Sequence, residues 1–392
     1  MSESVTLFED TKVAFADKSM HELKREHFFF NLVKNKKLVT IGSALTEFGL
    51  KIGLPLAPIF KHTVFEHFVG GETLEDSRGV IEQLGNKKIG SLINYGVEGE
   101  DSEKDFDRSL NENLNALRFC RSESFARGVC IKITGIARSE LLEKIQAGKK
   151  LSVKENREVT RAQERFTTLC EEAVKCDTIL YIDAEEYWIQ KVLDEWVLSA
   201  MKKYNKEKAV IFDTLQMYRW DQIEYLENII DQAEKDKFHL GLKLVRGAYM
   251  EKERNRAERL GYPSPIQESK ANTDKDFNKA IEICIQHIDR VEICVATHNE
   301  ESCYELTLLV EQYNIPKNHP HIQLAQLYGM GDHITYNLAA QGYNANKYLP
   351  YGPVKNVIPY LIRRASENSS VEGQIGRELS LIQTELERRR TI

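Results

Sequence analysis

The stretch LGLKLVRGAY (240–249) is a short run of leucine and valine that ends in polar residues. Its apolar residues do not alternate strictly with polar ones, which is typical of a parallel strand buried on both faces. The charged Arg246 stands at the carboxyl end of the run. The stretch therefore predicts a buried parallel strand that leads into a polar loop.

Seven further runs resemble it: IGSLINYGVEGE (89–100), GVCIKITG (128–135), DTILYIDAEE (177–186), AVIFDTLQMY (209–218), VEICVATHN (291–299), HIQLAQLYG (321–329) and ANKYLPYG (345–352). Segments 106–121, 155–175, 187–204, 219–236, 273–288, 300–312 and 331–341 can each form an intervening helix. Eight such βα units predict an α/β fold of the (β/α)8, or TIM, barrel type, which typically needs about 250 residues. An open doubly wound sheet is the alternative, but no GxGxxG motif follows any run.

Residues 1–85 contain no run of this kind and predict an N-terminal helical region, interrupted at Gly70-Gly71. Residues 86–392 are expected to form the barrel and a C-terminal helical tail. In that tail, Leu379, Ile382 and Leu386 form one apolar stripe that predicts packing against the barrel or a partner.

Composition excludes several classes of protein. The chain has 392 residues and a net charge of −6, which argues against a dedicated nucleic-acid binder. No apolar run approaches the ~20 residues of a membrane span, and the first twenty residues resemble no secretory signal. Seven cysteines without a CxxC pair predict reduced, buried thiols, and His319-Pro-His321 has no evident third ligand, so we expect no metal site. These features predict a cytoplasmic protein with at most peripheral contact at the inner face of the cell membrane.

Polar residues follow six of the eight predicted strands. Active sites of barrels lie at the carboxyl ends of the strands, so these residues predict a site there. They are Lys132, Asp183, Gln216, Arg246, Thr297-His298-Asn299 and Tyr348.

The segment YLIRRASENSS (360–370) places Tyr360, Arg363, Arg364 and Glu367 on one helix face. This face is either solvated, with an Arg363–Glu367 ion pair, or a clamp in which two guanidinium groups bind a carboxylate. Spacing alone leaves both interpretations open.

Five motifs in order resemble the proline dehydrogenase family, whose members oxidise proline to Δ1-pyrroline-5-carboxylate with FAD. They are DAEE (183–186), KLVRGAYMEKER (243–254), ATHN (296–299), KYLPYGP (347–353) and YLIRRASENSS (360–370), and the resemblance spans about residues 90 to 370. It implies a distorted barrel whose last helix lies over the barrel mouth. It also implies non-covalent FAD, since no histidine or cysteine stands out as an attachment site.

The resemblance implies a substrate site as well. Arg363 and Arg364, assisted by Lys132, are expected to bind the proline carboxylate, and Asp183 is expected near the two arginines. The ring is expected to pack against three further residues, Leu327, Tyr348 and Tyr360. Asp183, Lys243 and Lys132 are the expected catalytic group.

The expected flavin contacts are Ala184, Gln216, Lys243, Arg246, Gly247, Ala248, Thr297, His298, Asn299 and Glu367. Lys243 is expected near the flavin edge, and Glu367 is expected to orient an arginine. Many bacterial members carry arginine where this chain has Lys243 and lysine where it has Arg246, so the basic contact to the flavin stays open.

The family transfers electrons to a membrane quinone in the first step of proline catabolism to glutamate, and pyrroline-5-carboxylate dehydrogenase is a candidate partner. Hydroxyproline dehydrogenase is the close alternative, but relatives with that specificity tend to read KSxPYG where this chain has Tyr348 in KYLPYG. A flavin-free barrel enzyme that binds a small carboxylate, and a binding protein without catalysis, are the more distant alternatives.

Overall fold

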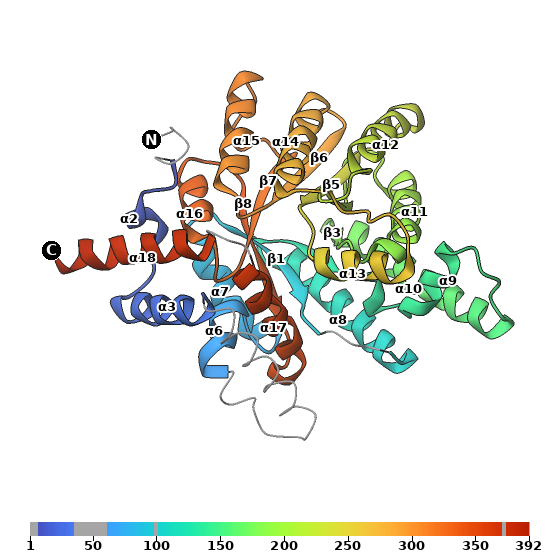
Figure 1. Ribbon diagram of the computed structural model, residues 1–392, viewed down its shortest axis with the longest axis horizontal. Helices are drawn as coiled ribbons and strands as arrows, with labels where there is room; N and C mark the ends of the chain where they lie inside the picture. Colours follow the sequence, from blue (N-terminus) through green and yellow to red (C-terminus); the bar gives the residue numbers. More distant parts are fainter. Residues whose placement is uncertain (1–6, 35–60, 98–100, 371–373, 392) are drawn as a thin grey trace.

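Eight parallel strands, hydrogen-bonded in chain order, close into a barrel with β8 beside β1 (Figure 1). The computed structural model describes residues 7–34, 61–97, 101–370 and 374–391. The strands are β1 (Gly90–Tyr95), β2 (Ala126–Ile131), β3 (Ile179–Ile182), β4 (Ile211–Gln216), β5 (Leu240–Val245), β6 (Val291–Ala296), β7 (Ile322–Leu327) and β8 (Ala345–Tyr351). Each of the eight predicted runs overlaps one strand, although β2 begins two residues before its run, so the barrel is confirmed and the open sheet is excluded.

Helices surround the barrel at the predicted positions. They are α8 (Glu103–Ser122), α10 (Val153–Cys176), α11 (Tyr187–Tyr204), α12 (Gln222–Asp236), α14 (Lys270–Gln286), α15 (Glu300–Gln312), α16 (Asp332–Ala340) and α17 (Val354–Ser370). The expectations missed the 3₁₀ turn η2 (Ile133–Gly135) and the helices α9 (Ser139–Gln146) and α13 (Met250–Leu260). Helix α9 has only eight residues and α13 is mostly charged, so neither gives a clear apolar stripe.

The barrel interior is filled by side chains from alternate strand positions, as barrels require. Its apolar layer consists of Leu92, Cys130, Tyr181, Ala209, Phe212, Cys294 and Ala325. All seven cysteines of the chain are buried, which confirms the predicted burial of the thiols. Polar side chains such as Asp183 lie further along the strands, toward the carboxyl end of the barrel.

The N-terminal region is helical in its described parts. Its elements are α2 (Thr11–Ala14), α3 (Met20–Val33), η1 (Lys61–Phe65), α6 (Glu66–Phe68) and α7 (Leu74–Gly85). The chain is interrupted between α6 and α7, as Gly70-Gly71 predicted. The domain boundary at residue 85 stays a prediction.

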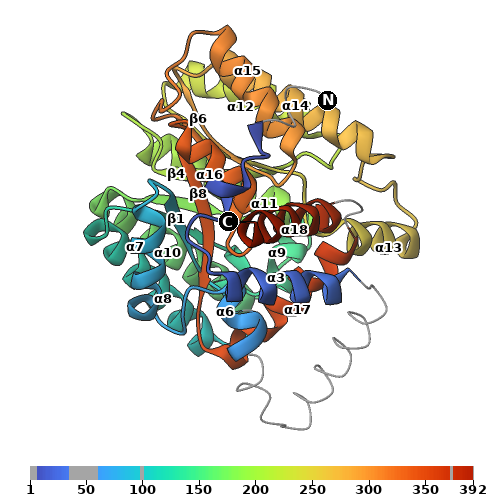
Figure 2. The ribbon, with the colours of Figure 1, turned by 90° about the vertical axis from the view of Figure 1, so that its left-hand side faces the viewer.

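The C-terminal helix α18 (Gln374–Arg390) lies beside α3, far from it in sequence (Figure 2). The predicted stripe of Leu379, Ile382 and Leu386 is buried there against Phe15, Leu23 and other apolar residues that precede or belong to α3. The Thr11 hydroxyl donates a hydrogen bond to Glu385 at 2.9 Å. The two terminal segments therefore form one layer on the outside of the barrel.

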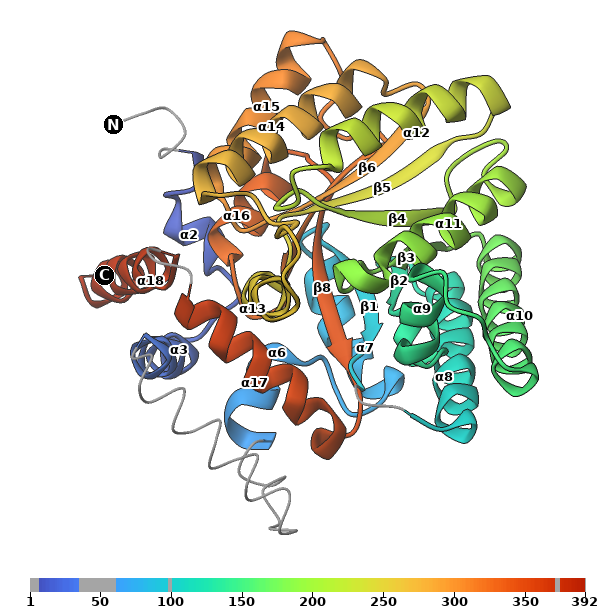
Figure 3. The same ribbon diagram turned by 45° about the vertical axis from the view of Figure 1, so that its right-hand side comes forward.

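Helix α17 follows directly on β8 and lies next to its carboxyl end (Figure 3). Val357 and Leu361 of this helix are buried in one cluster with Met330 and Leu327, which come from the end of β7 and the turn after it. The last barrel helix therefore packs over the barrel mouth, as the resemblance implied. Within the described ranges, no helix is long and apolar enough to cross a membrane.

Candidate active site

Asp183, Lys243 and Tyr348 meet inside the mouth of the barrel. The Lys243 ammonium is ion-paired with Oδ1 of Asp183, and the Tyr348 hydroxyl donates a hydrogen bond to Oδ2 at 2.9 Å. Three separate strands supply these groups, since Asp183 follows β3, Lys243 lies in β5 and Tyr348 lies in β8. Both oxygens of the Asp183 carboxylate are thus engaged by partners from other strands.

Two aromatic rings enclose the ammonium group. The Lys243 nitrogen lies 5.5 Å from the ring centre of Tyr181 and 5.6 Å from that of Tyr348. Burial lowers the pKa of Lys243, but the Asp183 carboxylate outweighs it, and the net pKa is raised. Burial, reinforced by Asp183, also raises the pKa of Tyr348. At neutral pH the site therefore holds a charged lysine and a neutral phenol.

Apolar groups lie on one side of this mouth. Tyr360 is buried in the cluster that contains Leu327, at the end of β7. Tyr348 lies near Tyr360, since the Tyr360 phenol adds to the rise in the pKa of Tyr348. The three residues expected around the proline ring are thus neighbours. Helix α17 runs on through Arg363, Arg364 and Glu367, whose side chains lie outside the described part of the structure.

Lys132 follows β2 and is half-buried. It lies close enough to Glu185 to oppose the effect of burial, which raises the pKa of that carboxyl to about 7. Glu185 accepts hydrogen bonds from the backbone N–H of Thr134 at 3.0 Å and from its hydroxyl. The expectations missed Glu185, although it stands in the quoted DAEE motif two residues after Asp183.

Gln216 at the end of β4 and the backbone near Gly247 offer features that fit a polar ring system such as a flavin. The Gln216 side chain is buried, and its Oε1 has no hydrogen-bond partner among the described residues. Gly247 has φ +125°, and a Cβ there would lie 2.5 Å from the Tyr218 ring. Ala248 is exposed beside it, and Ala184 is half-buried after β3. An unpaired buried carbonyl and a close-packed glycine turn are consistent with a bound cofactor.

Arg246 braces the outer part of this region. Its guanidinium donates hydrogen bonds to Asp274 at 2.7 Å, Thr297 at 2.7 Å and Ser302 at 2.9 Å. It also stacks over Phe277, at 4.3 Å from the ring centre. Of the two basic residues of KLVRGAY, Lys243 therefore points into the barrel, whereas Arg246 joins β5 to α14 and α15.

The ATHN segment is ordered by backbone contacts. His298 Nε2 accepts a hydrogen bond from the Leu327 N–H at 3.2 Å. Asn299 caps α15 by accepting from the Ser302 N–H at 2.9 Å. Thr297 accepts from the Asn299 N–H at 3.1 Å. His298 thus joins the expected flavin segment to Leu327 on the expected substrate side.

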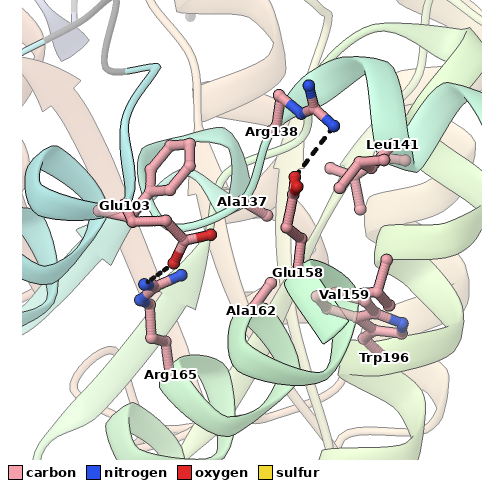
Figure 4. Close-up of a pocket in the computed structure, with 11 residues that line it drawn as sticks. Glu103, Ala137, Arg138, Leu141, Glu158, Val159, Ala162, Arg165 and Trp196 are labelled. Carbon is pink, nitrogen blue, oxygen red and sulfur yellow. Dashed lines mark hydrogen bonds and ion pairs between the residues drawn. The ribbon is translucent and has the colours of Figure 1, made fainter. Parts of the chain in front are cut away.

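A separate pocket lies outside the barrel, among α8, α9, α10 and α11 (Figure 4). Its charged residues pair with one another, Arg138 with Glu158 at 2.9 Å and Arg165 with Glu103 at 2.5 Å. None of the expected site residues lines it, so we place the candidate site at the barrel mouth. The described residues hold no group of three or more potential metal ligands.

Comparisons with known proteins identify the family that the chain resembles. A family model described as proline dehydrogenase matches residues 78–377. The carbapenem antibiotics biosynthesis protein CarD of Pectobacterium carotovorum is 34% identical over 322 residues, 82% of this chain and 83% of its own length. Mitochondrial proline dehydrogenase 1 of Dictyostelium discoideum is 30% identical, with 97% of this chain and 74% of its own length covered. Hydroxyproline dehydrogenase of Xenopus laevis is 30% identical, with 92% and 84% covered.

Solved structures support the fold. Proline utilization A from Bdellovibrio bacteriovorus superposes with a TM-score of 0.75 at 20% identity, over 95% of this chain. This chain spans 42% of the length of that protein.

Proposed function

The chain belongs to the proline dehydrogenase family, and on that premise we propose that it oxidises L-proline to Δ1-pyrroline-5-carboxylate with non-covalently bound FAD. The observation that carries the proposal is the carboxylate of Asp183, held between Lys243 and Tyr348 beside the apolar Leu327 and Tyr360. This arrangement offers an apolar wall for a small ring next to an ordered set of charges.

Proline is a zwitterion, so its carboxylate needs cationic donors. In our proposal Arg363, Arg364 and Lys132 bind that carboxylate. Leu327, Tyr348 and Tyr360 pack against the ring and hold it still, which lowers the entropic part of the barrier. These side chains would thereby hold the ring in one orientation, with its C5–H bond available to a bound flavin.

The residues that would hold the flavin are Ala184, Gln216, Lys243, Arg246, Gly247, Ala248, Thr297, His298, Asn299 and Glu367. Bound FAD supplies the two-electron acceptor for the hydride of proline C5. Lys243, enclosed in the barrel and paired with Asp183, would supply a positive charge to a bound flavin. Three of the five guanidinium N–H groups of Arg246 are engaged by Asp274, Thr297 and Ser302, so two remain that could contact the flavin.

The amine proton must also leave to form the C=N bond of the product. Asp183 is a poor base for this step, because both of its oxygens already accept hydrogen bonds from Lys243 and Tyr348. We therefore assign that proton to solvent and assign Asp183 the task of holding Lys243 and Tyr348 in place.

The cellular role follows the family. We propose that the electrons pass to a membrane quinone, that the enzyme is cytoplasmic with peripheral membrane contact, and that it starts the conversion of proline to glutamate. Pyrroline-5-carboxylate dehydrogenase, which would use the product, is the candidate partner.

Hydroxyproline is the second candidate substrate, since a hydroxyproline dehydrogenase is among the relatives. In our proposal Tyr348 favours proline, because its hydroxyl is bound to Asp183 and its large ring would meet a 4-hydroxyl of the substrate.

The visible spectrum of the purified protein tests the proposal. We expect flavin absorbance that bleaches when L-proline is added without oxygen. A colourless protein would favour a flavin-free barrel enzyme or a binding protein, and a flavin that proline does not reduce would exclude the proposed substrate.

A further inference from the structure

The turn between β7 and α16 adjoins both sides of the candidate site. Leu327 immediately precedes the turn, and the N–H of Tyr328 donates a hydrogen bond to the carbonyl of Tyr348 at 3.0 Å. Gly331 has φ +62°, and a Cβ there would lie 2.8 Å from Nδ1 of His298. A displacement of this turn would therefore move Leu327 and Tyr348 relative to His298.

A buried chain of charges ties the turn to its surroundings. Asp332, which begins α16, accepts from Lys347 through Oδ1 and from Lys18 through Oδ2, each at 2.6 Å. Lys347 is 1% exposed and also donates to the carbonyl of Met330 within the turn. Lys18, which lies just before α3, also pairs with Glu26 at 2.6 Å.

The C-terminal helix reaches the same turn. Glu378 of α18 is buried and accepts a hydrogen bond from the Gly331 N–H at 2.6 Å. Burial raises the pKa of Glu378, because the charged carboxylate is desolvated there. An apolar side chain at this position would avoid that loss of solvation free energy. Because the Glu378 carboxylate binds one particular backbone N–H, it stabilises one conformation of the turn.

We infer that four residues, Glu378, Asp332, Lys347 and Lys18, are positioning residues for the proposed substrate contacts Leu327 and Tyr348. Through them, the segment before α3 and the helix α18 hold these two side chains in place. The inference rests on the proposed function for its substrate. Lys347 adjoins Tyr348 in β8, and Asp332 ends the turn that starts after Leu327. Breaking a buried ion pair leaves an uncompensated charge, which is unfavourable. Conformations of the turn that separate Asp332 from Lys347 or Lys18 are therefore disfavoured.

Three variants of the holoenzyme test this. Glu378→Ala removes the acceptor for the Gly331 N–H, and we expect KM for L-proline to rise about 5- to 30-fold with a smaller change in kcat, as expected for one lost buried hydrogen bond. Glu378→Gln keeps an acceptor and should restore KM to within about threefold.

Glu385→Ala is the matched control. Glu385 lies two turns further along α18, is fully buried, pairs with Arg388 and Arg389 and accepts a hydrogen bond from Thr11. Its hydrogen bonds go to residues outside the turn, and Arg389 contacts only the backbone carbonyl of Lys18, not its ammonium group. It should lower thermal stability and leave KM unchanged. Equal KM values in the Glu378→Ala and Glu385→Ala enzymes would overturn the inference and leave these contacts with a stabilising role alone.

Hydrogen exchange without substrate separates this inference from the proposed function. In Glu378→Ala, peptides covering 327–332 and 347–349 should exchange faster than in the wild type, whereas Glu385→Ala should leave them unchanged. Unchanged exchange in Glu378→Ala would refute the positioning role even in an active enzyme. A wild-type protein that does not oxidise proline would refute the proposed function. The exchange result would then still show whether Glu378 holds the turn in place.

Discussion

Asp183 and Lys243 form an ion pair across the barrel mouth, although the strand β4 lies between the strands that carry them. Their side chains are 15% and 5% exposed, so the pair is largely removed from solvent. Such a pair contributes little net stability but is costly to break on one side only.

Asp183→Asn should therefore destabilise the protein strongly. It leaves the Lys243 ammonium without its counter-charge, and we expect a loss of about 3–5 kcal/mol in the free energy of unfolding. The double variant Asp183→Asn/Lys243→Met should recover part of that loss and remain inactive. Urea unfolding and proline turnover measure the two effects, and the exposed pair Lys208–Asp177 provides the control. A single variant as stable as the control would contradict the prediction.

Arg364→Met should weaken proline binding while the flavin stays bound. A charge-assisted contact to the carboxylate is worth roughly 1.5–3 kcal/mol, so kcat/KM should fall about 10- to 150-fold. Arg25→Met, at an exposed ion pair with Glu66, is the control and should have no effect. Unchanged kinetics of Arg364→Met would eliminate the clamp and favour the solvated helix face.

Proline should be preferred over trans-4-hydroxyproline. A 4-hydroxyl against the Tyr348 ring would clash or stay unpaired, which predicts a preference of about 5- to 150-fold in kcat/KM. Tyr348→Ser should narrow the gap, mainly by weakening proline. Tyr348→Phe, which removes only the hydroxyl bound to Asp183, should preserve the preference for proline. The test is to measure kcat/KM for both substrates with the wild type and the two variants. Equal kcat/KM values of the wild type for proline and hydroxyproline would contradict the assignment of proline as the substrate.

The flavin should be released by acid precipitation, since it is expected to be non-covalent. His298→Ala should lower flavin occupancy more than it changes the proline KM of the loaded fraction. Some effect on KM is expected, because His298 also accepts the hydrogen bond from Leu327. Colour that stays with the precipitated protein would show a covalent link.

Glu185 should make stability depend on pH. Burial raises its pKa from 4.5 to about 7, so the folded state holds its proton more tightly than the unfolded state. This contribution to stability is complete below the unfolded pKa and is lost as the pH rises through about 7. Glu185→Gln removes this titration, because glutamine does not ionise. Between pH 5 and pH 8 the free energy of unfolding of the variant should therefore fall less than that of the wild type, by on the order of 1–3 kcal/mol. Parallel pH profiles of urea unfolding would contradict this.

Much of the barrel is predictable from the sequence, because strands buried on both faces must be apolar throughout. The end residues of those strands also follow from the sequence, since parallel strands in a barrel share one carboxyl edge. Helices α9 and α13 escape prediction because one is short and the other is rich in charge, so helical periodicity is weak in both.

The contacts within the site are not predictable in this way. The partners of Asp183 lie 60 and 165 residues further along the chain, so their meeting depends on closure of the whole barrel. Glu378 and Lys18 lie in segments whose sequence shows only helical or turn character, and nothing local indicates that they reach the same turn. The roles of Arg363, Arg364 and Glu367 stay predictions from their spacing and from the resemblance.

The pairing of β8 with β1 also affects how the chain is made. About 250 residues separate the two strands, and at roughly 5–20 residues per second their synthesis takes on the order of 10 to 50 seconds. During that time one edge of β1 has no strand to pair with. A nascent chain with an open sheet edge is prone to associate with its neighbours, so production of this enzyme should depend on chaperones.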